Sequence, residues 1–142
     1  MRESATWPVT GSDDDLVGRA DIHDLVVEFY REVVFDDTLA PLFGEVAEVD
    51  WAQHIPRLID YWCRILLREG SYVGAVAAAH RHLHALEPIR IEHCDRWYEL
   101  WVRCVDARWA GPTADRAKGH AAVLMAGMAK HIFHLRWQPP PA

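Results

Sequence analysis

The chain lacks the features that mark secreted, membrane-spanning and disulfide-rich proteins. Its 142 residues include three cysteines, an odd number without CxxC spacing, which is typical of buried thiols in a reducing cytoplasm. No apolar run reaches bilayer length, because Arg64 and Arg68 interrupt the best stretch. Residues 1–20 show no basic region followed by an apolar one, so no signal peptide is predicted. We therefore expect a cytoplasmic protein without a membrane span.

Positive charge and strand patterns are also scarce. The net charge of −6 argues against a nucleic-acid-binding surface, which would normally be basic. No alternating apolar run is bounded by Asn-Gly or Asp-Gly turns, so strand signals are weak. About half of the residues are apolar and seven are tryptophans, enough for one domain with a substantial core. The expected fold class is all-α, with about five or six helices.

Apolar spacing predicts where the helices lie. An amphipathic stripe with spacing i, i+3, i+4 and i+7 begins at Ile22, and Asp21 is the expected N-cap of that helix. Three other long helices are expected over residues 50–67, 92–110 and 112–132, and a short helix over residues 74–86. The expected domain organisation is a polar N-terminal extension, a helical domain and a Pro-rich tail, over residues 1–20, 21–135 and 136–142.

Short motifs follow one another along the chain in a fixed order. They are Phe29-Tyr30, Asp37 to Phe43, Asp50 to Pro56, Asp60 to Trp62, Tyr72-Val73-Gly74, His80, Asp95 to Trp97, and Gly111-Pro112. This series resembles the truncated haemoglobins, and group III most closely, over roughly residues 21–132. The absence of Gly-Gly pairs is also similar to group III. The resemblance implies a truncated globin fold, a two-over-two helical sandwich around haem b (iron protoporphyrin IX).

The segment after residue 79 carries the candidate iron ligand. A neutral imidazole can bind haem iron, and the residue pattern alone leaves His80, His82 and His84 open. The resemblance selects His80, which stands six positions after Tyr72-Val73-Gly74. His82 and His84 are then expected to face solvent or to lie near the haem propionates. Arg81 suits a propionate carboxylate, the alternative being a solvated side chain.

Three polar side chains are candidates for the ligand side of the haem. The Tyr30 hydroxyl is expected to donate a hydrogen bond to bound dioxygen, unless it reaches solvent or a backbone carbonyl instead. His54 could donate to the ligand, gate the pocket or bind iron, the alternative being an exposed histidine in a first helical turn. Trp97 combines core packing with an indole N–H donor. Three apolar side chains are expected to line the haem slot: Phe43, Leu58 and Trp62.

The expected function is that of a haem-binding globin. It would bind dioxygen and other small ligands (nitric oxide, carbon monoxide, peroxide) at a pentacoordinate iron, for ligand binding or redox chemistry rather than bulk oxygen transport. The alternative is a nitric oxide dioxygenase or peroxidase that uses the same haem and an unidentified reductase. Enzymatic activity stays open. A non-haem metal protein ranks lower, because the alternating histidines from His80 to His84 would converge only on a strand.

Overall fold

The computed structural model describes residues 14–42, 51–69, 80–81, 84–85 and 88–141. Its regular elements are α1 (Arg19–Val33), α2 (Trp51–Leu67), α4 (Ile91–Arg108), α5 (Pro112–Met128) and the short π-helix η2 (Ala129–Phe133). Across these described ranges every regular element is helical and none is a strand. The all-α fold class is therefore confirmed.

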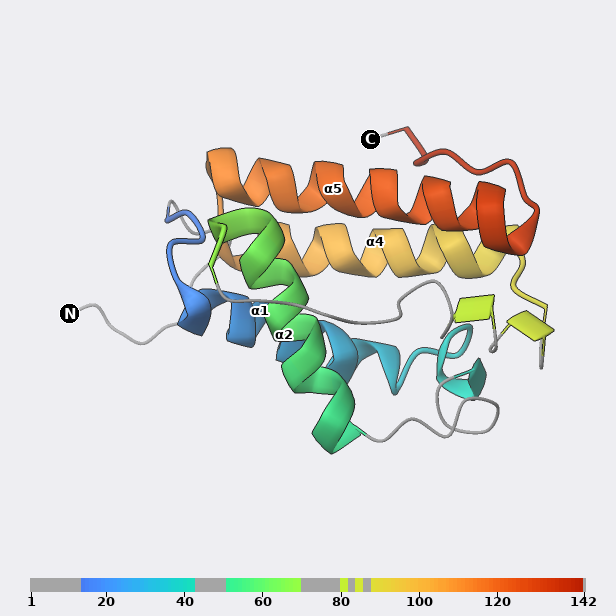
Figure 1. Ribbon diagram of the computed structural model, residues 1–142, viewed down its shortest axis with the longest axis horizontal. Helices are drawn as coiled ribbons and strands as arrows, with labels where there is room; N and C mark the ends of the chain where they lie inside the picture. The colour runs from blue at the N-terminus through green and yellow to red at the C-terminus, as the bar shows by residue number, and fades with distance from the viewer. Residues whose placement is uncertain (1–13, 43–50, 70–79, 82–83, 86–87, 142) are drawn as a thin grey trace.

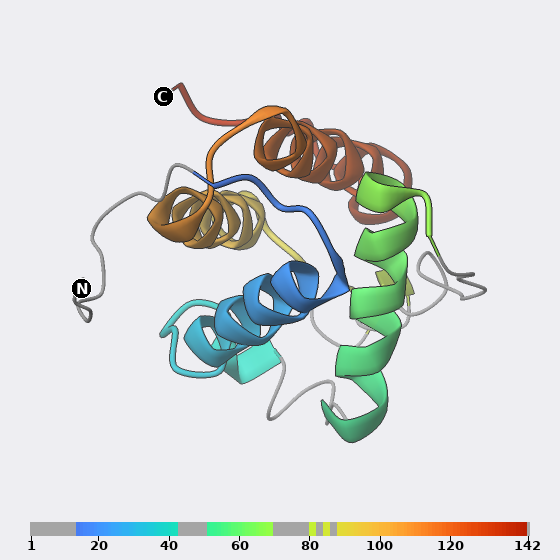
Figure 2. The same cartoon turned by 90° about the vertical axis from the view of Figure 1, so that its left-hand side faces the viewer.

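The helices form two layers. Figure 1 shows α4 and α5 side by side along the long axis of the molecule, with α2 crossing them obliquely. Turned by 90°, the view in Figure 2 looks along α4 and α5 and shows α1 and α2 as the second layer. α1 packs against α2 and α4, and α2 also contacts α5. This arrangement is the predicted two-over-two helical sandwich.

α1 begins one turn earlier than its expected cap. Its N-cap is Gly18, so the prediction of an N-cap at Asp21 is wrong. Asp21 lies in the first turn, and its carboxylate reaches back to accept a hydrogen bond from the Val17 N–H at 2.9 Å. An acidic residue in this place satisfies an otherwise unpaired backbone donor. The buried stripe is the predicted one: Ile22, Leu25, Val26, Phe29 and Val33.

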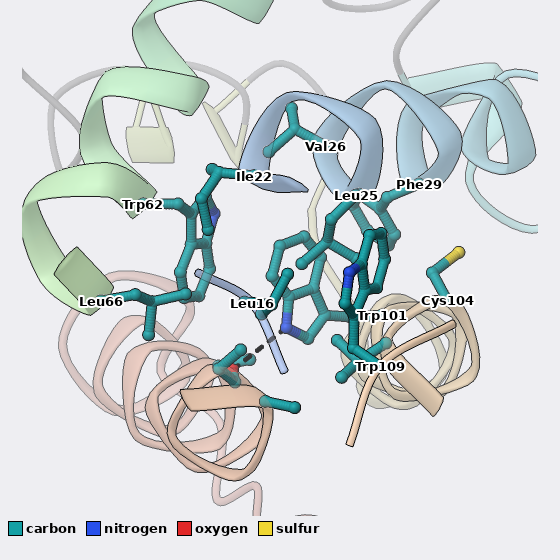
Figure 3. Packing of buried hydrophobic residues seen from close by; sticks show 14 of the residues in the cluster. Leu16, Ile22, Leu25, Val26, Phe29, Trp62, Leu66, Trp101, Cys104 and Trp109 are labelled. Atoms are coloured by element: carbon teal, nitrogen blue, oxygen red, sulfur yellow. Dashed lines mark hydrogen bonds between the residues drawn. The ribbon is translucent and has the colours of Figure 1, made fainter. Parts of the chain in front are cut away.

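Trp101 lies at the centre of the core, between the two layers (Figure 3). Its ring stacks on Trp62 of α2, with ring centroids 4.5 Å apart, and its indole N–H donates to the Ala117 carbonyl of α5 at 3.1 Å. One residue thus joins three helices, and its buried N–H has an acceptor. The three cysteines are buried and unbridged, as predicted: Cys63, Cys94 and Cys104.

The segment before α1 caps the start of α5. The Asp15 carboxylate accepts hydrogen bonds from the backbone N–H groups of Thr113 and Ala114, at 2.9 and 2.8 Å. Gly111 has φ +136°, and a Cβ there would come within 2.7 Å of the Asp15 carboxyl carbon, so this close approach requires glycine. The neighbouring Leu16 is 1 % exposed. Residues 14–16 are therefore part of the packed fold.

Substitution of Asp15 tests this cap. Asp15→Ala leaves two N–H groups of α5 without their acceptor, so the free energy of unfolding should fall by about 1–2 kcal/mol. Urea denaturation measures the change. The control is Asp37→Ala, at an exposed position, which should stay within about 0.5 kcal/mol of the parent. Equal losses in the two variants would contradict the capping role.

Candidate functional site

Tyr30 and His54 come together where the end of α1 meets the start of α2. Phe29 points into the core, so the next residue, Tyr30, faces sideways towards α2. The Tyr30 ring centroid lies 5.7 Å from that of His54 and 5.3 Å from that of Trp51, and both histidine and tryptophan rings lie in the first turn of α2. Two residues predicted separately from the sequence therefore share one site.

The Tyr30 hydroxyl is hydrogen-bonded to Trp97 of α4. Burial raises the pKa of Tyr30 above its ordinary value, and the hydrogen bond from Trp97 opposes this only in part. The phenol therefore stays protonated at neutral pH. Because an indole N–H can only donate, the Tyr30 oxygen accepts this bond. The role of Tyr30 as a hydrogen-bond donor to a ligand stays a prediction.

His54 is half-buried, and its imidazole lies among other ionisable groups. The pKa of His54 is lowered, first by burial and then by repulsion from His80 and Arg57. The neutral imidazole is consequently the favoured form at neutral pH. His80 is thus one of the groups that act electrostatically on His54, although the two are distant in sequence. That the two histidines flank one haem stays a prediction.

His80 is a half-buried helical residue beside η2. Its ring centroid is 6.4 Å from that of Phe133. His84 packs more closely on Phe133, at 5.3 Å, and its Nδ1 accepts a hydrogen bond from the Ile89 N–H at 2.9 Å. The His84 ring is therefore half-buried and holds the turn before α4 rather than facing solvent, and its alternative place near the haem propionates stays a prediction.

His93, which the sequence analysis did not single out, also has a structural role. His93 is 6 % exposed, and its Nδ1 accepts a hydrogen bond from the Arg90 N–H at 2.9 Å in a capping box at the start of α4. In a neutral imidazole whose Nδ1 accepts a hydrogen bond, Nε2 carries the proton, so neither nitrogen offers a free lone pair to a metal. Like His84, His93 is therefore a poor competitor of His80 as an iron ligand.

The remaining predicted site residues lie in different environments. Leu58 is half-buried and packs against the core, whereas Trp62 is 3 % exposed and stacked on Trp101. Arg81 is exposed beside His80. Phe43 lies outside the described residues, as does His82. Contact between any of these side chains and a haem stays a prediction.

Trp51 is a site residue that sequence reasoning missed. Its ring centroid lies 5.3 Å from that of Tyr30 and 5.5 Å from that of His54, so it holds both rings. The signal was present in the sequence, because Trp51 and His54 have the i, i+3 spacing that places two residues on one helical face. Trp51 therefore belongs to the candidate site.

An ion pair fixes the position of Trp97 relative to α1. Arg96 donates to the Asp36 carboxylate at 2.6 Å and to Glu99 at 2.9 Å. The other oxygen of the buried Asp36 carboxylate accepts from the backbone N–H groups of Thr38 and Leu39, both at 3.1 Å. A carboxylate that is bonded on both oxygens holds its partner firmly. The start of α4 is thereby tied to the turn that follows α1.

The described residues can be compared with what a zinc centre and a haem iron each require. Within the described ranges, no three His, Cys, Asp or Glu side chains come together as a metal site. A tetrahedral zinc centre would need such a cluster, whereas haem iron needs one axial imidazole and an apolar surround. His80 can supply that imidazole, and Tyr30, His54 and Trp97 supply polar groups nearby. None of the helices traced in the described part is long and apolar enough to cross a membrane.

Known proteins resemble this chain in sequence and in fold. No family model matches it. Over 92 residues the chain is 27 % identical to a group 3 truncated hemoglobin of Campylobacter jejuni, an alignment that covers 63 % of this chain and 67 % of the relative. The crystal structure of a group III truncated hemoglobin from Campylobacter jejuni superposes with a TM-score of 0.73 at 21 % identity, over 85 % of this chain and 95 % of that one. Both findings agree with the resemblance seen in the sequence.

The lowered pKa of His54 predicts acid sensitivity. The unfolded chain binds a proton at His54 near pH 6.5 and the folded chain only at lower pH, so the unfolded state binds more protons in this interval. This contribution to stability is complete above about pH 6.5 and is lost as the pH falls towards the folded pKa. In His54→Gln, the free energy of unfolding should therefore fall less between about pH 7 and about pH 5.

Urea denaturation at both pH values measures this change in the free energy of unfolding. The matched control is His23→Gln, which removes an exposed histidine on α1. The parent and His23→Gln should lose stability in parallel, while His54→Gln loses less. If His54→Gln lost as much stability between the two pH values as the parent, His54 would not be held in its neutral form.

Proposed function

We propose that this chain, which has the truncated globin fold and is similar to group III truncated haemoglobins as its sequence predicted, is a haem-binding globin. His80 would bind the iron of haem b, and dioxygen or another diatomic ligand would bind on the side of Tyr30 and His54. The observation that carries the proposal is the packing of the Tyr30 and His54 rings, whose centroids lie 5.7 Å apart where the end of α1 meets the start of α2.

Haem, when bound, supplies an iron centre that takes a diatomic ligand and exchanges electrons. The protein side chains would hold and shape that centre. His80 provides one imidazole nitrogen to the iron. His54 is neutral, but its ring is held against Tyr30 and Trp51, so we propose that it does not bind the iron at rest. The resting iron would then have five ligands and one open position.

The ligand side is arranged to stabilise negative charge. Trp97 donates to the Tyr30 oxygen, and the phenol would in turn donate a hydrogen bond to a bound ligand. Burial keeps that phenol protonated. A donor fixed in advance costs little reorganisation when charge develops on the ligand. Tight retention of dioxygen is the expected consequence.

A second candidate is redox catalysis at the same site. It is favoured by the presence of two polar side chains, Tyr30 and His54, at one site, with Trp97 donating its only N–H to the Tyr30 oxygen. Two donors stabilise charged oxygen species better than one donor does. Such a site suits a nitric oxide dioxygenase or a peroxidase, for which an unidentified reductase would supply electrons. Bulk oxygen transport, which needs easy release, fits this donor set less well.

The visible spectrum of the purified protein tests the proposal as a whole. A protein produced in haem-sufficient cells should show a strong Soret band at one haem per chain. The band should shift when the reduced protein is exposed to carbon monoxide. A colourless protein that also fails to take up added haemin would contradict the proposal.

Replacement of His80 tests the iron ligand. His80→Ala should lose stoichiometric haem, or should hold it only when free imidazole is added, because the single protein–iron bond is gone. Absorbance titration with haemin measures the retention. The control is His131→Ala, at an exposed position of η2, which should bind haem as the parent does. Normal haem retention in His80→Ala, together with loss of haem in His82→Ala or His84→Ala, would show that the other histidine binds the iron.

Replacement of Tyr30 tests the ligand-side donor. A hydrogen bond to a charged acceptor is worth about 1.5–3 kcal/mol, so Tyr30→Phe should raise the dioxygen dissociation rate by about ten- to a hundredfold. Stopped-flow displacement of dioxygen by carbon monoxide gives this rate. The control is Tyr98→Phe, whose ring packs on Trp137 away from this cluster. Unchanged dissociation in Tyr30→Phe would leave Tyr30 with a packing role only.

A further inference from the structure

A series of aromatic rings connects the candidate site with the contact between α2 and α5. Trp97, which hydrogen-bonds Tyr30, stacks on Trp101 with a centroid distance of 6.4 Å and an interplanar angle of 2°. Trp101 stacks on Trp62 at 4.5 Å, and Trp62 meets Tyr61 edge to face at 5.4 Å. Each ring is thus adjacent to the next. The series crosses the core and ends at a half-buried tyrosine.

The far end of the series carries a proton partner. The Tyr61 hydroxyl lies 2.7 Å from Nε2 of His120, which projects from α5. The His120 ring also packs against Trp62, with centroids 5.4 Å apart. Burial lowers the pKa of His120, so its ring is neutral at neutral pH and one nitrogen can accept a proton. Tyr61 therefore has a base within hydrogen-bond distance.

Core packing explains only part of this arrangement. It accounts for Trp62 and Trp101, which are 3 % and 1 % exposed and fill the space between the layers. It does not require a half-buried phenol paired with an imidazole at the end of the series. Tryptophan and tyrosine are the side chains most easily oxidised by one electron, and a tyrosine that loses an electron must also release its phenolic proton. The Tyr61–His120 pair meets that requirement.

We propose that Tyr61 and His120 form a one-electron donor site, joined to the candidate haem site through Trp62, Trp101 and Trp97. This inference rests on the proposed function for its oxidant, which is a peroxide reduced at the haem. One electron leaves Tyr61 and passes along the three tryptophans to the site. The Tyr61 O–H bond breaks, its proton moves to Nε2 of His120, and a neutral tyrosyl radical remains.

The cycle closes with an external reductant. A small phenol or an enediol such as ascorbate, reaching half-exposed Tyr61, gives up one electron, and His120 returns the proton to the phenol oxygen. Two such turns deliver two electrons. Together with two protons from the reductant, they convert one hydrogen peroxide molecule into two water molecules. The substrate class that we infer is therefore a small organic one-electron reductant.

Pulse radiolysis of the full chain tests the relay without any haem. Azide radicals oxidise tryptophan, and in the parent the tryptophanyl absorption should decay as tyrosyl absorption rises, at a rate independent of protein concentration. Tyr61→Phe should lose this intramolecular step, and the matched control Tyr98→Phe should keep it. His120→Leu should slow the step by about tenfold, equivalent to about 1.4 kcal/mol of barrier, and should reduce its solvent deuterium isotope effect.

The same variants loaded with haem test the connection to the site. After mixing with hydrogen peroxide and rapid freezing, the parent and Tyr98→Phe should give a tyrosyl signal in electron paramagnetic resonance, and Tyr61→Phe should not. An undiminished transfer step or tyrosyl signal in Tyr61→Phe overturns the inference. If the protein takes up no haem, the proposed function is contradicted. Pulse radiolysis still tests electron transfer to Tyr61, because it needs no haem.

Discussion

The hydrogen bond from the Trp97 indole to the Tyr30 hydroxyl joins the core of this fold to its candidate site. Tyr30 lies on α1 and Trp97 on α4, so the bond depends on how these helices pack. The packing is fixed on one side by Phe29, whose ring meets both Trp97 and Trp101 edge to face. On the other side the Asp36–Arg96 ion pair holds the helix ends together. The direction of the phenol is therefore a consequence of core packing.

Local sequence patterns predicted the parts of the fold that depend on neighbours in the chain. The buried stripe of α1 follows from a period of 3.6 residues, and the start of α5 follows from Pro112 in its first turn. Contacts between residues that are distant in sequence could not be predicted from such patterns. Asp15 caps α5 across 98 positions of sequence, and no pattern of short range encodes such a bond.

The residues of the candidate site could be predicted in part. The resemblance to truncated haemoglobins pointed to Tyr30, His54 and Trp97, and in the structure Tyr30 contacts both His54 and Trp97. The roles of the other histidines were not predictable, because they depend on which backbone group each ring nitrogen meets. His84 bonds the Ile89 N–H, and His120 bonds the Tyr61 hydroxyl. The same residue type therefore serves as a structural acceptor in one place and a candidate metal ligand in another.

The central claim is the proposal that His80 would be the one protein ligand of a haem iron, with Tyr30 and His54 left to meet the bound diatomic ligand. Resonance Raman spectroscopy of the reduced, haem-loaded protein addresses it most directly, because the iron–imidazole stretching band appears only when the ferrous iron has five ligands. This band should be present in the parent and absent in His80→Ala. A six-coordinate low-spin spectrum in the reduced parent, lost on replacement of His54, would contradict the claim.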